Sequence, residues 1–322
     1  MQKVNAQDST LVRLLKKRES VLVLILIIMG AAMGILSDSF LTMKNQMNVF
    51  RTMSMTVIIA IGEVFVLTSG GIDLSVGYIV ASAGVALAAV YNGTGSPLLA
   101  LLTALAIGVA VGVINGLLVT KGRIVPFIAT LGTQQILKGL TVFLTNAKPI
   151  TFTNDFLLSI GQGYFFDIPI PVIIMLALLA LYFVVFNCTV FGARVQAIGG
   201  NAEASRISGI NIELNLVITY VLSGLLAALS GIIMCCRIAT GSPESGIGWE
   251  INAVSAAVIG GTSMSGGIGS IAGALLGAAV INFLNNGMVM LKISSNLQPV
   301  ITGILLIAVV LSDNLKHSNK TS

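Results

Sequence analysis

Apolar stretches with almost no Asp, Glu, Lys or Arg recur along nearly the whole chain. A helix needs about 20 mostly apolar residues to cross a bilayer. The stretches are 20–37, 52–72 (interrupted by Glu63), 74–120, 124–147 (interrupted by Lys138), 168–193, 214–236, 251–291 and 293–312. Turn-forming residues at 91–97 and 260–269 divide the two longest stretches into two helices each. The pattern therefore predicts about ten crossings, of which the one at about 249–262 is short.

The composition agrees with a membrane protein. Of the 322 residues, 56% are hydrophobic and 9% are charged, whereas soluble domains carry about 25% charged residues. With a mean hydropathy of +0.99, this excludes a soluble globular protein and a disordered one. The long unbroken apolar runs differ from the short alternating segments of an outer-membrane barrel. We expect an all-α polytopic membrane bundle, with one transmembrane domain at 20–313 between an N-terminal segment, 1–19, and a tail, 314–322.

Basic residues are distributed unevenly between the predicted loops. With ten crossings both termini lie on one side, and that side carries 11 of the 17 Lys and Arg residues. Cytoplasmic loops are enriched in these residues, so both termini are expected in the cytoplasm. A cleaved signal peptide over residues 1–37 is the alternative for the first stretch. The net charge of +5 reflects this orientation rather than binding of nucleic acid.

Residues for metal or nucleophilic chemistry are scarce. The three cysteines include the adjacent pair Cys235 and Cys236, which fits neither a disulfide framework nor a CxxC metal site. The lone histidine, His317, lies in the polar tail. No Gly is followed by Lys-Ser or Lys-Thr, so the chain lacks an ATP-binding P-loop. We therefore expect no enzyme activity and no directly bound cofactor or metal.

The segment Thr68–Gly77 ends one apolar helix and begins another at once. The Asp73 carboxylate can cap the new helix by accepting hydrogen bonds from its free N–H groups. A helix broken at membrane depth is tolerated where it lines a cavity or lies inside the protein. One interpretation is thus a break beside a translocation pathway, and the other is a tight turn at the membrane surface. The pathway residues on the first interpretation are Ser69, Gly70, Gly71, Asp73 and Ser75.

A shorter match to this segment occurs late in the chain. Ser69-Gly-Gly-Ile72 recurs as Ser265-Gly-Gly-Ile268. Transporters are often built from internal repeats with paired interrupted helices, and a match of this kind is one that such a repeat would leave. A four-residue Gly-rich match also arises by chance, so both explanations stay open.

Two charged residues fall inside predicted crossings. Glu63 lies ten residues before Asp73, and Lys138 is near the middle of its stretch. A charge inside a crossing usually faces the interior of the bundle and marks a polar path or a proton site. A Glu63–Lys138 ion pair would offset part of the cost of removing both charges from water. The alternatives are a purely structural ion pair, or a Lys138 side chain that reaches to an interface.

The longest predicted cytoplasmic loop, about 188–213, contains a short helix. Asn201 suits its N-cap, Glu203 its first turn and Gly209 its C-terminal cap. A helix this short is marginal alone in water, so it is expected either to dock on a partner or to lie on its own bundle. On the docking interpretation the contact residues are Asn201, Glu203, Ser205, Arg206 and Gly209.

Together these motifs resemble the bacterial sugar-uptake ABC transporter permeases of the ribose type. The resemblance extends from about residue 20 to residue 315, and it is weakest in the loop 148–168. A charged residue at position 63 departs from the family's apolar residue there. The motifs that carry the resemblance are Thr68–Gly77, Phe191–Arg194, Ala197–Asn201, Arg206–Ile210, Ala257–Gly267 and Phe283–Gly287.

The resemblance implies partners that the chain itself does not contain. A permease of this family has the type II-like importer architecture and lies in lipid in the bacterial inner membrane. It pairs with a second permease chain, here expected to be an identical one. It binds an ATP-binding cassette ATPase that carries ATP–Mg, and it receives sugar from a periplasmic or lipid-anchored binding protein. The alternative function is an ion-coupled secondary transporter of a small polar solute that uses Glu63, Asp73 and Lys138.

Overall fold

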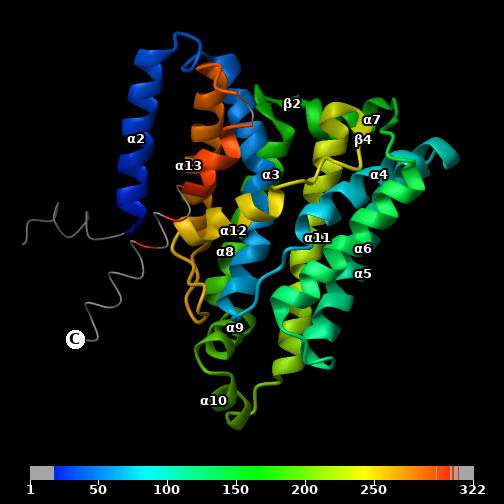
Figure 1. The fold of residues 1–322 in the computed structure, drawn as a ribbon, viewed down its shortest axis with the longest axis vertical. Coiled ribbons are helices and arrows are strands. Elements are labelled where there is room, and N and C mark those ends of the chain that lie inside the picture. Colours follow the sequence, from blue (N-terminus) through cyan, green and yellow to red (C-terminus); the bar gives the residue numbers. More distant parts are fainter. Residues whose placement is uncertain (1–17, 295, 305–306, 308–310, 312–322) are drawn as a thin grey trace, which may run out of the picture.

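The computed structural model describes residues 18–294, 296–304, 307 and 311 as one helical bundle (Figure 1). Eight of its helices are long and apolar enough to cross a membrane. They are α2 (Arg18–Leu36), α3 (Met43–Thr68), α4 (Val76–Thr94), α5 (Pro97–Thr120), α6 (Pro126–Thr145), α8 (Ile170–Cys188), α11 (Ile212–Ile238) and α13 (Ile271–Met290). These bounds confirm the predicted polytopic all-α fold. The N-terminal segment and tail that we predicted lie almost wholly outside the described residues.

The two remaining predicted crossings have a different status. The short one corresponds to α12 (Trp249–Ile259), whose 11 residues span only about half of a bilayer core. The last one, 293–312, falls partly outside the described residues. The count of about ten is therefore matched by eight full-length helices, one half-length helix and one helix that is described in part.

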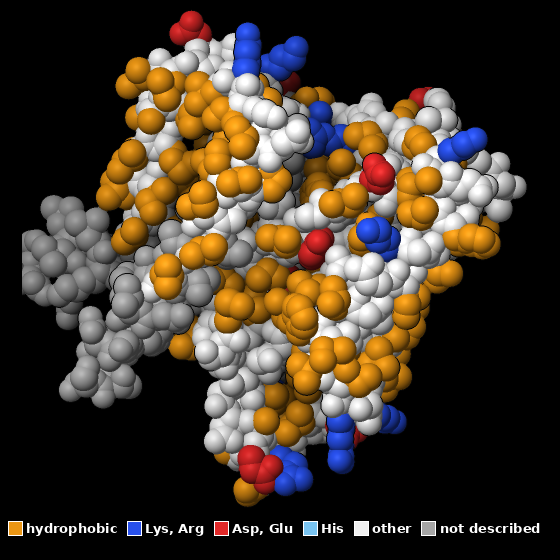
Figure 2. Space-filling view, viewed as in Figure 1, with side chains coloured by type: hydrophobic (Ala, Val, Ile, Leu, Met, Phe, Trp, Pro, Cys, Tyr) orange, Lys and Arg blue, Asp and Glu red, His pale blue; other side chains and the backbone are white. Residues whose placement is uncertain are grey.

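The two ends of the bundle carry different small elements. At one end lie α9 (Val190–Gly200) and α10 (Ala202–Ile207), in the loop predicted at 188–213 (Figure 1). At the other end lie α7 (Asp155–Gln162) and two small sheets. Figure 2 shows Lys, Arg, Asp and Glu mostly at these two ends, with apolar side chains over the surface between them. This distribution is that of a membrane-spanning protein, with polar ends in water and an apolar waist in lipid.

The two small sheets lie at the α7 end. Strand β1 (Ile150–Thr151) pairs antiparallel with β4 (Thr240–Gly241), which ties the loop after α6 to the residues after α11. Strand β2 (Tyr164–Phe165) pairs with β3 (Ile168–Pro169) through a hairpin turn, in which Phe166 and Asp167 both have positive φ.

Helices α3 and α11 form the centre of the bundle. Most of α3 from Met53 onwards is buried, and α11 packs against α3, α4 and α5. Contact between α5 and α11 depends on glycines at a four-residue spacing, because a Cβ at Gly112 would lie 2.5 Å from the carbonyl oxygen of Tyr220. A Cβ at Gly116 would similarly lie 2.7 Å from the Cα of Val217. Small residues at this spacing let membrane helices approach closely, which explains part of the chain's high glycine content.

The chain between α3 and α4 runs through the interior of the bundle. After α3 ends, Gly70 turns the backbone with a φ of +86°. The residues that follow run between helices to the start of α4 (Figure 1). Asp73 and Ser75 in this segment are completely buried. The structure thus favours a break inside the protein over a tight turn at the surface.

Candidate functional site

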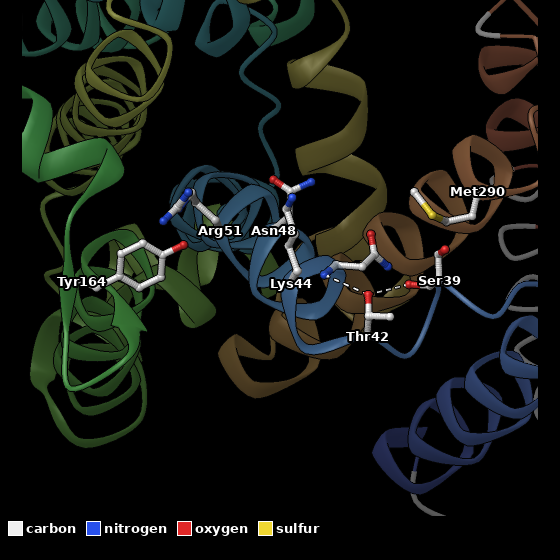
Figure 3. A pocket seen from close by; sticks show the side chains of 8 residues that line it. Ser39, Thr42, Lys44, Asn48, Arg51, Tyr164 and Met290 are labelled. Carbon is white, nitrogen blue, oxygen red and sulfur yellow. Dashed lines mark hydrogen bonds between the residues drawn. The ribbon is translucent and has the colours of Figure 1, made fainter.

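Three cavities that share lining residues form a groove along α3, α12 and α13, which we call the amide groove. The first cavity, of about 450 Å³, lies at the α7 end (Figure 3). It shares Asn48 and Met290 with a second cavity of about 290 Å³. The second shares Asn252 and Asn285 with a third of about 320 Å³. The groove therefore leads from the α7 end of the bundle towards the half-length helix α12.

The first cavity is basic. Figure 3 shows Arg51 reaching towards Tyr164 while Lys44 lies nearer to Thr42 and Ser39. The Arg51 guanidinium lies 4.8 Å from the centre of the Tyr164 ring and donates a hydrogen bond to the Gln162 carbonyl oxygen at 3.2 Å. An aromatic face and a carbonyl hold a guanidinium in place without neutralising its charge. The entrance of the groove therefore keeps a positive potential.

The deeper part of the groove is neutral and rich in amides. Among the described residues that line the second and third cavities, none is Asp, Glu, Lys or Arg. Polar side chains there are Asn48, Thr52, Thr56, Asn252, Asn282, Asn285, Asn286, Gln298 and Thr302, and Trp249 supplies an aromatic wall. An amide offers both donors and an acceptor. The lining therefore suits an uncharged solute that carries both kinds of group.

Helical periodicity places these side chains on common faces. On α13, Asn282, Asn285, Asn286 and Val289 follow the i, i+3, i+4, i+7 spacing of one helix face. On α3 the lining positions from 45 to 56 follow the same spacing, and Trp249 and Asn252 lie one turn apart on α12. This set could not be recognised from the sequence because its polar positions are divided among several helices, and α12 contributes only Asn252 besides Trp249. The signal was the asparagine pair within Phe283–Gly287.

Several groove side chains are held by hydrogen bonds, and others are not. Asn45 and Asn286 exchange two amide hydrogen bonds of 2.8 and 2.9 Å. Arg237 of α11 donates to the Thr52 hydroxyl at 2.9 Å and to the Asn48 side-chain oxygen at 2.7 Å. By contrast, three other groove side chains make no hydrogen bond among the described residues and are available to a solute, namely Thr56, Asn252 and Asn285.

Asp73 lies at the centre of a buried polar network, outside the groove. Its carboxylate accepts hydrogen bonds from the Ser75 backbone N–H at 3.0 Å, the Ser75 hydroxyl at 2.5 Å and the Ser223 hydroxyl at 2.9 Å. Asn115 of α5 donates to the Ser75 hydroxyl at 2.8 Å and accepts from Thr133 of α6 at 2.7 Å. The predicted cap is wrong, because Ser75 is the N-cap of α4 and no side chain caps the helix, so Asp73 does not accept from the free N–H groups of its first turn. Asp73 instead fixes Ser75 just before α4 and belongs to a network that joins α5, α6 and α11.

Glu63 on α3 is fully buried, and both of its carboxylate oxygens lack a hydrogen-bond partner among the described residues. The Tyr220 hydroxyl is also buried without a partner, and it lies within electrostatic range of both Glu63 and Asp73. No Lys or Arg among the described residues forms an ion pair with either carboxylate. The two acids therefore lie together in the core of the bundle, away from the amide groove.

The ion pair that we considered between Glu63 and Lys138 is not formed. Lys138 is exposed on α6, where its Nζ lies 5.9 Å from the centre of the Tyr78 ring. It lines a shallow depression on the outer face of α6 rather than the groove. Glu63 faces the core of the bundle, whereas Lys138 lies on the outer face of α6. The position of a residue along an apolar stretch of the sequence does not reveal which way its side chain points.

The predicted cytoplasmic helix is present as α10. Asn201 accepts a hydrogen bond from the Ala204 backbone N–H at 2.9 Å, and Gly209 follows the helix with φ of +82°. Glu203 and Arg206 form an exposed ion pair of 2.6 Å, while Ser205 is buried. The capping scheme read from the sequence is therefore confirmed, whereas the docking role of these residues stays a prediction.

A backbone junction links this loop to both Gly-Gly segments. The Gly267 N–H, between α12 and α13, donates to the Thr68 carbonyl oxygen at the end of α3, at 2.8 Å. Gly199 near the end of α9 packs on both, because a Cβ there would lie 2.6 Å from the Gly267 nitrogen and would overlap the Thr68 oxygen. The two similar motifs are thus neighbours in space, and the loop that carries α10 contacts them directly.

Comparisons with known proteins agree with the fold and with these motifs. A family model described as branched-chain amino acid transport system / permease component matches residues 45–310. The chain belongs to this family. It is therefore a multi-pass permease component, and the ion-coupled secondary transporter has no support from its relatives.

The curated relatives match nearly the full chain. The ribose import permease protein RbsC of Bacillus subtilis is 43% identical over 91% of this chain and 92% of its own length. RbsC of Escherichia coli K12 is 39% identical over 94% and 95%. The L-arabinose transport system permease protein AraH of Escherichia coli K12 is 36% identical over 90% and 88%. No solved structure matches the chain.

Proposed function

We infer that this permease is the membrane-spanning subunit of an ATP-driven importer of a ribose-like monosaccharide. The neutral amide lining of the groove carries the inference. The family description names branched-chain amino acids, but an amino acid is a zwitterion that needs a charged or otherwise strongly polar partner at each end. No charged side chain among the described residues lines the deep groove, and the neighbouring Arg237 is already hydrogen-bonded to Thr52 and Asn48, whereas amides match the hydroxyl groups of a sugar. The ribose and arabinose permeases among the relatives agree with this choice.

The assignment of partners follows from the two ends of the bundle. The α10 end faces the cytoplasm of the bacterial inner membrane, on the same side as both termini, and binds a separate ATPase that carries ATP–Mg. Ile207, which is 80% exposed on α10, supplies an apolar contact. The α7 end, with the basic entrance of the groove, receives a sugar-binding protein. A second, identical permease chain completes the pore.

Exchanging the charges of α10 tests the ATPase contact. The Glu203–Arg206 pair is exposed, and exposed ion pairs contribute little to stability. The double variant Glu203→Arg/Arg206→Glu keeps an ion pair but reverses its direction on the docking surface. We expect the chain to remain folded while co-purification with the ATPase and ATP-coupled uptake fall by about tenfold or more. Intact assembly and uptake would remove α10 from the ATPase contact.

Co-purification from the native membrane tests the proposed function as a whole. The tagged chain, solubilised in a mild detergent, is expected to bring with it an ATP-binding cassette subunit, identified by mass spectrometry. In proteoliposomes, uptake of radiolabelled ribose should then require both ATP and that subunit. Uptake driven by an ion gradient in the absence of the ATPase would instead support a secondary transporter.

A further inference from the structure

We propose that the permease itself contains a sugar-binding site, formed where the second and third cavities of the amide groove meet. The site is made by Trp249 and Asn252 of α12, Asn285 of α13 and Thr56 of α3. Its ligand is a neutral monosaccharide in transit, bound without help from the separate binding protein. This inference rests on the proposed function. It adds a second site, besides the binding protein, at which the imported sugar is selected.

Unpartnered polar groups are the first argument for the site. The Asn285 side-chain oxygen is buried without a hydrogen-bond partner, and the Asn252 amide and Thr56 hydroxyl make no hydrogen bond among the described residues. Buried polar groups in folded proteins are normally satisfied. These groups come from three helices and meet at one cavity. A ligand with several hydroxyl groups would satisfy them together.

The aromatic wall is the second argument. Trp249 is the only tryptophan in the chain, and it lines the second cavity beside these amides. A sugar ring has an apolar face of C–H groups as well as its hydroxyl edge. A flat indole facing a set of amides matches both surfaces of such a ring. The two connected cavities, of about 290 and 320 Å³, have the size of small-ligand sites.

Charge provides the basis for selection. Among the described residues, charged side chains line only the first cavity, where they are Lys44 and Arg51. Arg237 lies beside the second cavity, but its guanidinium already donates to the Thr52 hydroxyl and the Asn48 side-chain oxygen. A phosphorylated sugar or an amino acid that moves inwards would therefore leave its charged partners at the entrance, at a large cost in lost hydration. The site is therefore expected to exclude charged solutes even when they reach the entrance.

The single tryptophan makes the site measurable. In the purified full-length chain in detergent micelles, without ATPase or binding protein, Trp249 emission is followed as D-ribose, L-arabinose or D-allose is added. We expect a saturable change in the millimolar range, because a few hydrogen bonds and one aromatic contact give only weak binding. Ribose 5-phosphate and leucine should give no saturable change. An equal response to all five compounds would overturn the proposal.

Matched variants locate the response. Asn252→Leu and Asn285→Leu keep the side-chain volume and remove the amide, and each is expected to weaken sugar binding by about tenfold. Asn187→Leu, an exposed position at the end of α8, serves as the control and should bind as the unmodified chain does. Sugar binding that is unchanged in both groove variants would overturn the assignment. A more conservative change, Asn252→Ser, covers the case in which leucine disturbs folding.

The complete importer separates this proposal from the proposed function. In proteoliposomes with ATPase and binding protein, Asn252→Leu should lower maximal ribose uptake by about tenfold. Stimulation of ATP hydrolysis by the sugar-loaded binding protein should persist, because docking takes place elsewhere. Normal uptake by this variant would eliminate the internal site while leaving the importer assignment intact. Failure of the unmodified chain to import sugar with its partners would instead contradict the proposed function.

Discussion

Replacing Gly199 by alanine is expected to reduce ATP-coupled uptake by about tenfold or more. A Cβ at this position would overlap the carbonyl oxygen of Thr68 and lie 2.6 Å from the backbone nitrogen of Gly267. Both neighbours are backbone atoms, so no side-chain rotation can relieve the overlap. The junction between α9, α3 and the α12–α13 loop would have to open.

The consequence for transport follows from what the junction connects. The loop carrying α10 contacts the end of α3 and the residues before α13 through this backbone junction, and Phe191 of α9 also stacks on Phe65 of α3. A movement of α10, driven by a docked partner, can pass directly to the two helices that line the groove. Interfaces packed this closely have discrete arrangements and do not deform continuously. Separating the contact should therefore uncouple the loop from the groove.

Gly200 provides a matched control for this prediction. A Cβ built on Gly200 has no heavy atom within 4 Å, and its backbone is not left-handed. Gly200→Ala should therefore transport as the unmodified chain does, at a similar amount in the membrane. The measurement is initial uptake in proteoliposomes, normalised to the permease present. Equal uptake by the two variants would show that the junction does not transmit movement.

Sequence patterns predicted the elements of this fold well because each crossing is determined locally. Twenty apolar residues between turn signals form a membrane helix largely irrespective of their neighbours. The caps of α10 were predictable for the same reason, since Asn201 and Gly209 act within one turn of themselves. Features that depend on a few neighbouring residues could therefore be predicted from the sequence.

The site was harder to predict from the sequence because it depends on which helix faces pack against each other. Glu63 and Lys138 both fall inside crossings, yet Glu63 faces the core and Lys138 lies exposed on the outside of α6. The amide groove combines polar positions from helices separated by about 200 residues in the chain, such as Asn48 and Asn252. Sequence periodicity gives the face of each helix but not its partner. The break at Asp73 was recognised correctly, but its network with Ser223 was not foreseeable.

Replacing Asp73 by leucine is expected to destabilise the permease, on the order of 3–9 kcal/mol, and to abolish uptake. The substitution would orphan the Ser75 and Ser223 hydroxyl donors and the Ser75 N–H, all of them buried. Each buried donor left without a partner costs about 1–3 kcal/mol. Asp73→Asn should keep most of the stability, because its amide oxygen can accept from Ser75 and the Ser223 hydroxyl can rotate to accept instead.

Glu63 provides the contrast that makes this prediction specific. It is as deeply buried as Asp73, but neither of its oxygens accepts a hydrogen bond among the described residues. A buried polar group without a hydrogen-bond partner is costly, so its replacement by an apolar side chain of similar size is expected to be neutral or stabilising. Thermal unfolding in detergent should therefore show a lower Tm for Asp73→Leu and an equal or higher Tm for Glu63→Leu. A large loss of stability in both variants would mean that burial alone, and not the hydrogen-bond network around Asp73, determines the outcome.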